Sequence, residues 1–259
     1  MKLVVALSAL TIVAAGCGGG GSDDNSSVSA ASAINAAQGL YGGTDANDNT
    51  VGGVVLDSGA FYFVYADSST DSLGLVQGTA SAAHGTFQSS DARTFDISGK
   101  SASDTPILAG YNEKNSVQGA IYTSAAKQSS TKFNVLYDAN YERPVALSAV
   151  AGKYSGSAGS TRGGETATFT IGDDGSIKGA GASGCTFTGT ATPHGNTDVL
   201  DATITFGPSP CYYSGATLSG VVFVSNNQLL AALTLPNRSD AFVVAGSKWL
   251  MATAAVSAR

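Results

Sequence analysis

Short segments in which apolar and polar residues alternate dominate the chain, and turns rich in glycine and aspartate separate them. In Thr166–Ile171 the apolar residues Ala167, Phe169 and Ile171 alternate with threonines, and Ala202–Phe206 repeats the pattern. Alternation with a period of two predicts antiparallel strands that have one buried and one solvated face. The pattern therefore predicts an all-β fold.

Two of the predicted strands form a hairpin. Val51–Leu56 and Ala60–Tyr65 flank the segment Asp57-Ser58-Gly59, whose composition is typical of a hairpin turn. Further strands are predicted at Leu73–Ala80, Gly85–Gln88, Thr94–Ile97, Val117–Thr123 and Lys132–Tyr137.

The second half of the chain repeats motifs of the first half. Gly39–Gly43 and Gly152–Gly156 both read G-x-Y-x-G. Two glycine motifs also recur 101 positions further along the chain, at Gly74 and Gly175 and at Gly119 and Gly220. Equal spacings of this kind predict a tandem duplication of a β module of roughly 100 residues.

The domain organisation follows from these patterns and from composition. We expect a signal peptide over residues 1–16, a lipidated cysteine with a flexible linker over 17–32, an N-terminal β-barrel-like module over 33–143 and a C-terminal β-barrel-like module over 144–259. The linker contains GGGGSDDNSS, which has too few apolar residues to form a core.

The first residues have the layout of a secretory signal. Lys2 precedes the apolar run Leu3–Val13, which is too short to span a bilayer, and small residues lead to Cys17. The ending resembles a bacterial lipobox, although Ala14 stands where a larger aliphatic residue is usual, and the resemblance implies lipidation of Cys17. In similar lipoproteins an aspartate directly after the cysteine favours the inner membrane, so Gly18 implies the outer membrane. The alternative is an ordinary secretory signal in which the cysteine is incidental.

The cysteine count predicts one disulfide. If Cys17 carries lipid, Cys185 and Cys211 remain as a pair in an oxidising compartment. A bridge between them would stabilise the fold by about 3 kcal/mol. The competing reading is a metal pair, but two sulfurs without nearby histidines do not complete a tetrahedral zinc site.

Charge and motif content argue against several classes of function. The net charge is −6, and the chain lacks the clustered Lys and Arg that nucleic acid requires. Gly179–Gly184 reads G-x-G-x-x-G, but a predicted strand follows where a dinucleotide site needs a helix, so we expect no cofactor. Asp45–Asn49 places oxygen ligands at alternate positions without the glycine and glutamate of a calcium loop; a polar surface loop is favoured, and weak calcium binding stays open. No catalytic constellation stands out, and we expect a protein that is not an enzyme.

The strand Ala60–Tyr65 is bulky on both faces and allows two interpretations. It is either covered by the other module, or it presents a partner-binding patch. The candidate partner-binding residues are Phe61, Tyr62, Phe63 and Tyr65.

Longer runs resemble a known group of proteins. Thr168–Gly195, Pro210-Cys211 and Leu218–Gly220 resemble a repeated domain of proteobacterial outer-membrane lipoproteins, and the first half, with FYFVYAD and GLVQGTAS, resembles the module that accompanies it. The architecture is similar to calycin-like barrels and to the barrels of transferrin-binding and factor-H-binding surface lipoproteins. The resemblance implies a fold of two tandem small antiparallel β-barrel-like modules and a place at the outer membrane, on its periplasmic or cell-surface face.

These observations favour a membrane-anchored, non-enzymatic lipoprotein that binds a protein partner or interacts with the envelope. Such a protein would be surface-exposed and antigenic if it faces outward. The alternative is a carrier that holds a small apolar ligand in a barrel cavity. Large side chains that fill both barrels would argue against the carrier.

Overall fold

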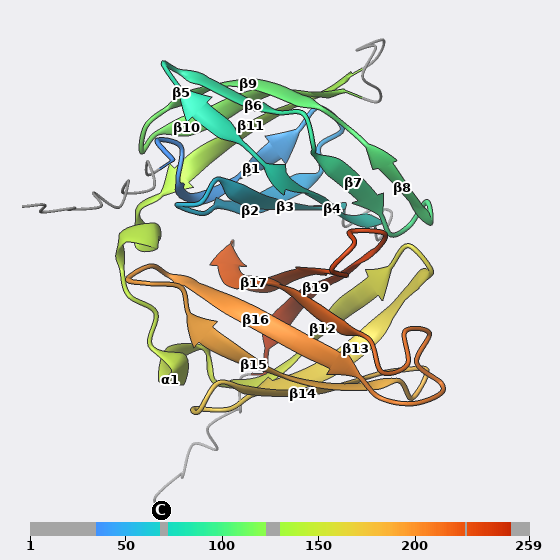
Figure 1. The fold of residues 1–259 in the computed structure, drawn as a ribbon. Coiled ribbons are helices and arrows are strands. Elements are labelled where there is room, and N and C mark those ends of the chain that lie inside the picture. The colour runs from blue at the N-terminus through green and yellow to red at the C-terminus, as the bar shows by residue number, and fades with distance from the viewer. Residues whose placement is uncertain (1–34, 68–71, 123–129, 226, 250–259) are drawn as a thin grey trace, which may run out of the picture. The chain divides into compact units, whose positions relative to one another are not determined.

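The computed structural model describes residues 35–67, 72–122, 130–225 and 227–249. Within them, antiparallel strands form two sheets in tandem, and the only helical segments are η1 (Ala139–Glu142) and α1 (Leu147–Val150) (Figure 1). The prediction of an all-β fold with two antiparallel β modules is confirmed. No helix among the described residues is long and apolar enough to cross a membrane.

The first module is an open, 11-stranded sheet with the order β5-β6-β9-β10-β11-β1-β2-β3-β4-β7-β8. Its strands are β1 (Gly39–Asp45), β2 (Thr50–Val55), β3 (Ala60–Asp67), β4 (Ser72–Thr79), β5 (Ser81–Ala83), β6 (Thr86–Ser89), β7 (Arg93–Asp96), β8 (Ser101–Asp104), β9 (Ile107–Asn112), β10 (Ser116–Tyr122) and β11 (Ser130–Asp138). The sheet curls on itself, because Phe61 of β3 packs against Phe87 of β6, with ring centroids 5.6 Å apart. One face therefore encloses an aromatic core.

The second module is a closed barrel in which strands pair in chain order and the last strand returns to the first. Its strands are β12 (Gly152–Ser160), β13 (Gly163–Ile171), β14 (Ser176–Gly181), β15 (Thr186–Pro193), β16 (Val199–Phe206), β17 (Thr217–Ser225), β18 (Gln228–Thr234) and β19 (Ala241–Lys248). The apolar positions of the alternating segments Thr166–Ile171 and Ala202–Phe206 point into this barrel. Closure removes the exposed strand edges that an open sheet leaves.

Both modules begin in the same way. Tyr41 in β1 donates a hydrogen bond from its hydroxyl to the carbonyl of Ala37 at 2.7 Å, and Tyr154 in β12 donates one to the carbonyl of Val150 at 2.5 Å. In each case a buried tyrosine reaches back four residues to the segment before the strand. The two G-x-Y-x-G motifs thus occupy equivalent structural positions.

The turns between the second and third strands of the two modules also match. Gly59 and Gly175 both have positive φ, at 84° and 80°. Their carbonyls accept hydrogen bonds from the amides of Ala80 and Ala191, at 2.8 and 2.7 Å. Glycine meets this backbone requirement because a side chain is strained at positive φ.

The repeat spacing of 101 residues, in contrast, is wrong as a guide to equivalent positions. It aligns Gly74, which lies in β4, with Gly175, which lies in the turn before β14, the third strand of the barrel. The residues that match in structure are Tyr41 with Tyr154 and Gly59 with Gly175. Both pairs are separated by more than 101 positions. Glycine is abundant enough in the chain for a false register to arise.

The two sheets belong to one compact unit and share an apolar interface. Outward-facing residues of β2–β4, such as Val54, Val64 and Leu75, pack in one cluster with outward-facing residues of the barrel, such as Phe223 and Val243. The other module thus covers one face of the Ala60–Tyr65 strand, as the first of the two interpretations expected.

A polar clamp flanks this interface. Arg238, in the loop between β18 and β19, donates from Nη2 to the carbonyl oxygens of Gln77 at 2.8 Å and Asp91 at 2.7 Å, and from Nη1 to the Asp91 carboxylate at 3.2 Å. The guanidinium thus ties a barrel loop to the first sheet.

Candidate functional site

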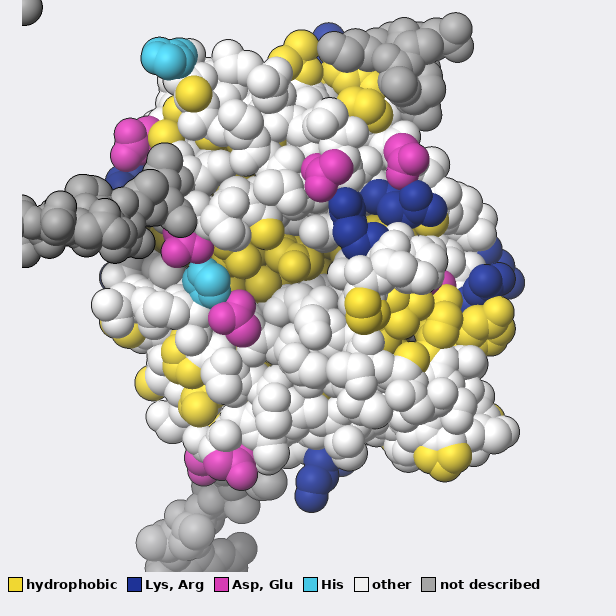
Figure 2. All heavy atoms as spheres, viewed as in Figure 1, with side chains coloured by type: hydrophobic (Ala, Val, Ile, Leu, Met, Phe, Trp, Pro, Cys, Tyr) yellow, Lys and Arg dark blue, Asp and Glu magenta, His cyan; other side chains and the backbone are white. Residues whose placement is uncertain are grey.

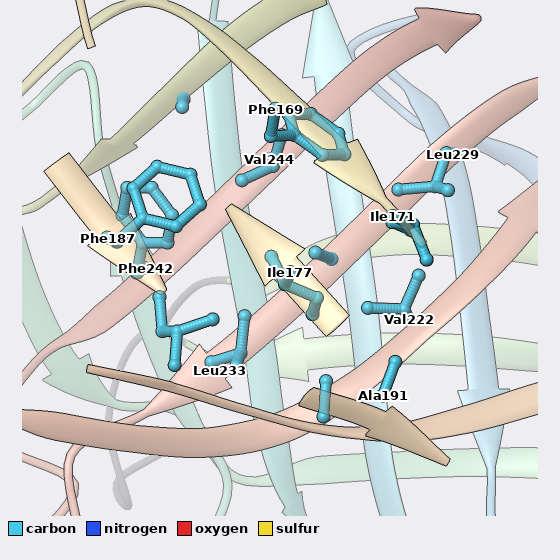
Figure 3. Close-up of a cluster of buried hydrophobic side chains, with 14 of the residues drawn as sticks. Phe169, Ile171, Ile177, Phe187, Ala191, Val222, Leu229, Leu233, Phe242 and Val244 are labelled. Carbon is cyan, nitrogen blue, oxygen red and sulfur yellow. The ribbon is translucent and has the colours of Figure 1, made fainter. Parts of the chain in front are cut away.

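The barrel interior is filled by large side chains (Figure 3). Phe169, Phe187 and Phe242 project inward, together with aliphatic residues of the remaining strands, and leave a cavity of about 20 Å³. A cavity in the core of the first sheet, lined by Phe63, Val76 and Phe133, measures about 30 Å³. Spaces of this size hold about one water molecule. Neither of these two spaces has room for an apolar ligand, so the carrier interpretation is wrong for them.

The candidate partner-binding residues do not form a surface patch. Phe61 is fully buried and Phe63 nearly so, because both side chains point into the core of the first sheet. Tyr62 points the other way and packs in the interface with the barrel. Tyr65 lies half-buried beside the core. The partner-patch interpretation of this strand is therefore wrong, since the second sheet and the curl of the first cover both faces.

The predicted cysteine pair is bonded. Cys185, in the turn between β14 and β15, forms a disulfide with Cys211 in the loop between β16 and β17, and their Cα atoms lie 4.5 Å apart. The bridge holds the 207–216 loop against the end of the barrel. Cys17, the predicted lipidation site, lies outside the described residues.

Beside this disulfide lies a groove of about 290 Å³, which we call the barrel-end groove. The β12–β13 hairpin, the turn before β15, the 207–216 loop and β19 form its walls. Its lining includes Arg162, Glu165, Ser183, Pro210 and Tyr212. Hydrophobic side chains gather beside basic ones at the right of the view in Figure 2, the side on which Figure 1 places the β12–β13 hairpin.

Tyr212 and Arg162 form the exposed part of the groove. The Tyr212 side chain is 65% exposed, and the Arg162 Cζ lies 4.9 Å from the centre of its ring. A guanidinium at this distance is attracted to the aromatic face, so the two side chains hold each other in place. Tyrosine and arginine are enriched among the residues that contribute most to protein–protein binding.

A buried carboxylate connects two of the segments that form the groove. Asp240 is 2% exposed and accepts hydrogen bonds from the Thr161 amide at 3.1 Å, from the Thr161 hydroxyl at 2.8 Å and from the Tyr213 hydroxyl. Burial and the hydrogen bond to Asp240 raise the pKa of Tyr213 to about 12. Asp240 therefore joins the hairpin that carries Arg162 to the loop that carries Tyr212.

Glu165 is already engaged within the groove. Its carboxylate accepts hydrogen bonds from the Ser183 amide at 2.5 Å and from the Ser183 hydroxyl at 3.0 Å. This leaves the Arg162–Tyr212 pair as the part of the groove that can meet a partner.

The sequence patterns did not single out Arg162 or Tyr212. A signal existed, because Tyr212 and Tyr213 directly follow a predicted disulfide cysteine in a loop, where two adjacent aromatic side chains cannot both be buried by strand alternation. The position of Arg162 depends on hairpin pairing between β12 and β13, which a single strand pattern does not show.

Comparisons with known proteins give little. No family model matches the sequence, and no curated protein matches it. Among solved structures, the chain is similar to the crystal structure of isotype 1 transferrin binding protein B from serogroup B Neisseria meningitidis, at 11% sequence identity and a TM-score of 0.27. The match covers 74% of this chain and 66% of that one, less than two thirds of its length. A likeness this weak carries no argument, so the fold class rests on the strand pairing described above.

Proposed function

We propose that the protein is a lipid-anchored outer-membrane lipoprotein that binds a protein partner through the barrel-end groove. The exposed Tyr212–Arg162 pair, mounted on a disulfide-braced loop, is the observation that carries the proposed binding role. The signal-like residues before Cys17 support the anchor.

The anchor would work through the sulfur of Cys17. A diacylglycerol thioether there, with an acylated amino group, places two or three chains in the bilayer, enough for stable attachment. The Gly- and Ser-rich residues that follow would give the β modules reach from the membrane surface. A filled barrel interior supports a surface-binding role over a ligand-carrying one.

Labelling with radioactive palmitate tests the anchor. Cells that express the wild-type chain should incorporate label and retain the protein in the outer-membrane fraction, whereas Cys17→Ser should lose both. Absence of label from the wild type would refute lipidation. Protease treatment of intact cells then reports which face of the outer membrane carries the protein, since cleavage requires that the protein lies on the cell surface.

The binding role is tested once a partner is captured by crosslinking from intact cells. Tyr212→Ala and Arg162→Ala should each weaken binding of the purified partner about tenfold or more, as expected for central contact residues. Trp249→Ala is the control and should bind normally, because Trp249 is also an exposed aromatic residue beside a cation but does not line the groove. Equal affinity of all variants would refute the groove as the binding surface.

A further inference from the structure

The β7–β8 hairpin at the edge of the first sheet has an unusual inner face. Thr94 and Asp96 in β7 pair with Ser103 and Ser101 in β8, and all four side chains line a cavity of about 330 Å³ at the open end of the sheet. We call this cavity the polar mouth, which Asp45 and Tyr65 also line. Its volume falls in the usual range for small-ligand pockets.

This polarity is not what core formation requires. The alternate residues Phe95 and Ala102 face the barrel, and Phe95 is fully buried there. The inward positions of the neighbouring strands are apolar, as at Val51 and Val76. A hairpin that only closed the curled sheet would continue that apolar pattern, because inward positions of a small barrel are normally filled by apolar side chains.

An aromatic ring lies beside the polar residues of β7. Tyr65 stands directly opposite Gly74 of β4, and a Cβ atom on that glycine would lie 2.1 Å from the Tyr65 Cζ. The missing side chain therefore leaves room for the ring over the neighbouring strand. The ring lines the cavity together with the apolar side chains of Val76 and Ile121.

The polar mouth therefore places aromatic and apolar side chains next to hydroxyl and carboxylate groups, because Tyr65 lies over Gly74, the residue that pairs with Asp96. Two carboxylates, from Asp45 and Asp96, and no Lys or Arg lie among its described lining residues. That charge disfavours phosphates and acidic sugars. A metal is also disfavoured, because the described residues contain no group of three carboxylate, imidazole or thiolate side chains that could hold one.

We propose that the polar mouth binds a neutral pyranose sugar. One face of such a ring is made of C–H groups, which pack on the Tyr65 ring. Its rim of hydroxyls donates hydrogen bonds to Asp96, whose Oδ1 also accepts one from the Gly99 amide at 2.8 Å, and exchanges them with Ser101 and Ser103. The polar mouth and the barrel-end groove lie on different modules, so sugar binding can be tested independently of the proposed protein partner.

Saturation-transfer NMR on the purified full chain, with glucose, galactose, mannose and N-acetylglucosamine at millimolar concentration, tests the proposal. At least one sugar should receive saturation on its ring protons. Asp96→Asn should weaken the binding of that sugar about tenfold or more, since a hydrogen bond to a charged acceptor is stronger than one to a neutral acceptor. Asp104→Asn is the matched control, because Asp104 lies on the same hairpin but pairs outward with Arg93 and is not part of the lining.

A second variant guards against misfolding. Tyr65→Leu should abolish transfer while circular dichroism stays unchanged, and a variant that unfolds is replaced by Ser103→Val, with the same expectation. If a methyl glycoside also binds, the natural ligand is the end of a glycan chain. If only the free sugar binds, the natural ligand is a monosaccharide. Either result supports the proposed site. No transfer to any sugar, transfer that survives Asp96→Asn and Tyr65→Leu, or binding of calcium alone would overturn the proposal.

Discussion

Replacing Phe61 with alanine separates the two interpretations of the Ala60–Tyr65 strand. The side chain is 0% exposed and contacts the rings of Phe63 and Phe87, with centroids 5.7 and 5.6 Å away. Phe87 comes from β6, so the substitution also removes a contact that holds the curled sheet together. A residue on a partner surface would have none of these features.

The magnitude follows from the buried area. A phenylalanine buries about 150–250 Å², which at ~25 cal/mol per Å² is worth about 4–6 kcal/mol. Substitutions of this type in cores cost about 3–5 kcal/mol, the range that we expect for Phe61→Ala. That loss is a large part of the total stability of a typical domain.

Urea unfolding followed by circular dichroism measures the loss as a lower midpoint at unchanged slope. Tyr212→Ala is the contrasting variant, because its ring is exposed and the change should stay within about 0.5 kcal/mol. A loss below about 1 kcal/mol for Phe61→Ala would show that this ring is not part of the core and would reopen the partner-surface interpretation.

Three further outcomes are expected. Reduction of the Cys185–Cys211 bridge should lower the free energy of unfolding by about 3 kcal/mol, measured with and without reductant; an unchanged midpoint would contradict a stabilising bridge. Arg238→Ala should cost about 1–3 kcal/mol in the same assay, because it leaves the Gln77 and Asp91 carbonyls without their charged donor, and a neutral result would mean that water replaces it fully. Alkaline pH should destabilise the fold: burial and the bond to Asp240 raise the pKa of Tyr213 from 10.0 to about 12, so its stabilising contribution is complete below about pH 10 and is lost as the pH rises to about 12. Stability measured across that range should fall less steeply in Tyr213→Phe, and identical curves would refute the assignment.

The sequence by itself determined the fold class and the position of its most regular strands. Period-two alternation located β13 and β16, because each has one face buried and one in water. The Asp57–Gly59 turn located the β2–β3 hairpin, since its glycine takes a positive φ that few other residues tolerate. The count of cysteines pointed to a bridge between Cys185 and Cys211 once Cys17 was assigned to the lipid anchor, and the structure contains that bridge.

Short polar strands escaped the sequence patterns. β5 and β8 contain only SAA and SASD, which have no hydrophobic alternation, and their strand conformation depends on partners elsewhere in the sheet. The sequence also misaligned the two modules. The spacing of 101 residues came from glycines, which are abundant in the chain, whereas the hydrogen bonds of Tyr41 and Tyr154 show which positions of the two modules are equivalent.

Only the tertiary structure decided which apolar surfaces are covered and which polar ones are exposed. Phe61 and Phe63 look the same in sequence whether they face a partner or a core; the curl of the first sheet buries them. Arg162 meets Tyr212 because strand pairing and a disulfide bring together segments that are far apart along the chain. Local patterns report the periodicity of a strand, but burial depends on which other strands pack against it, and that information lies in long-range contacts.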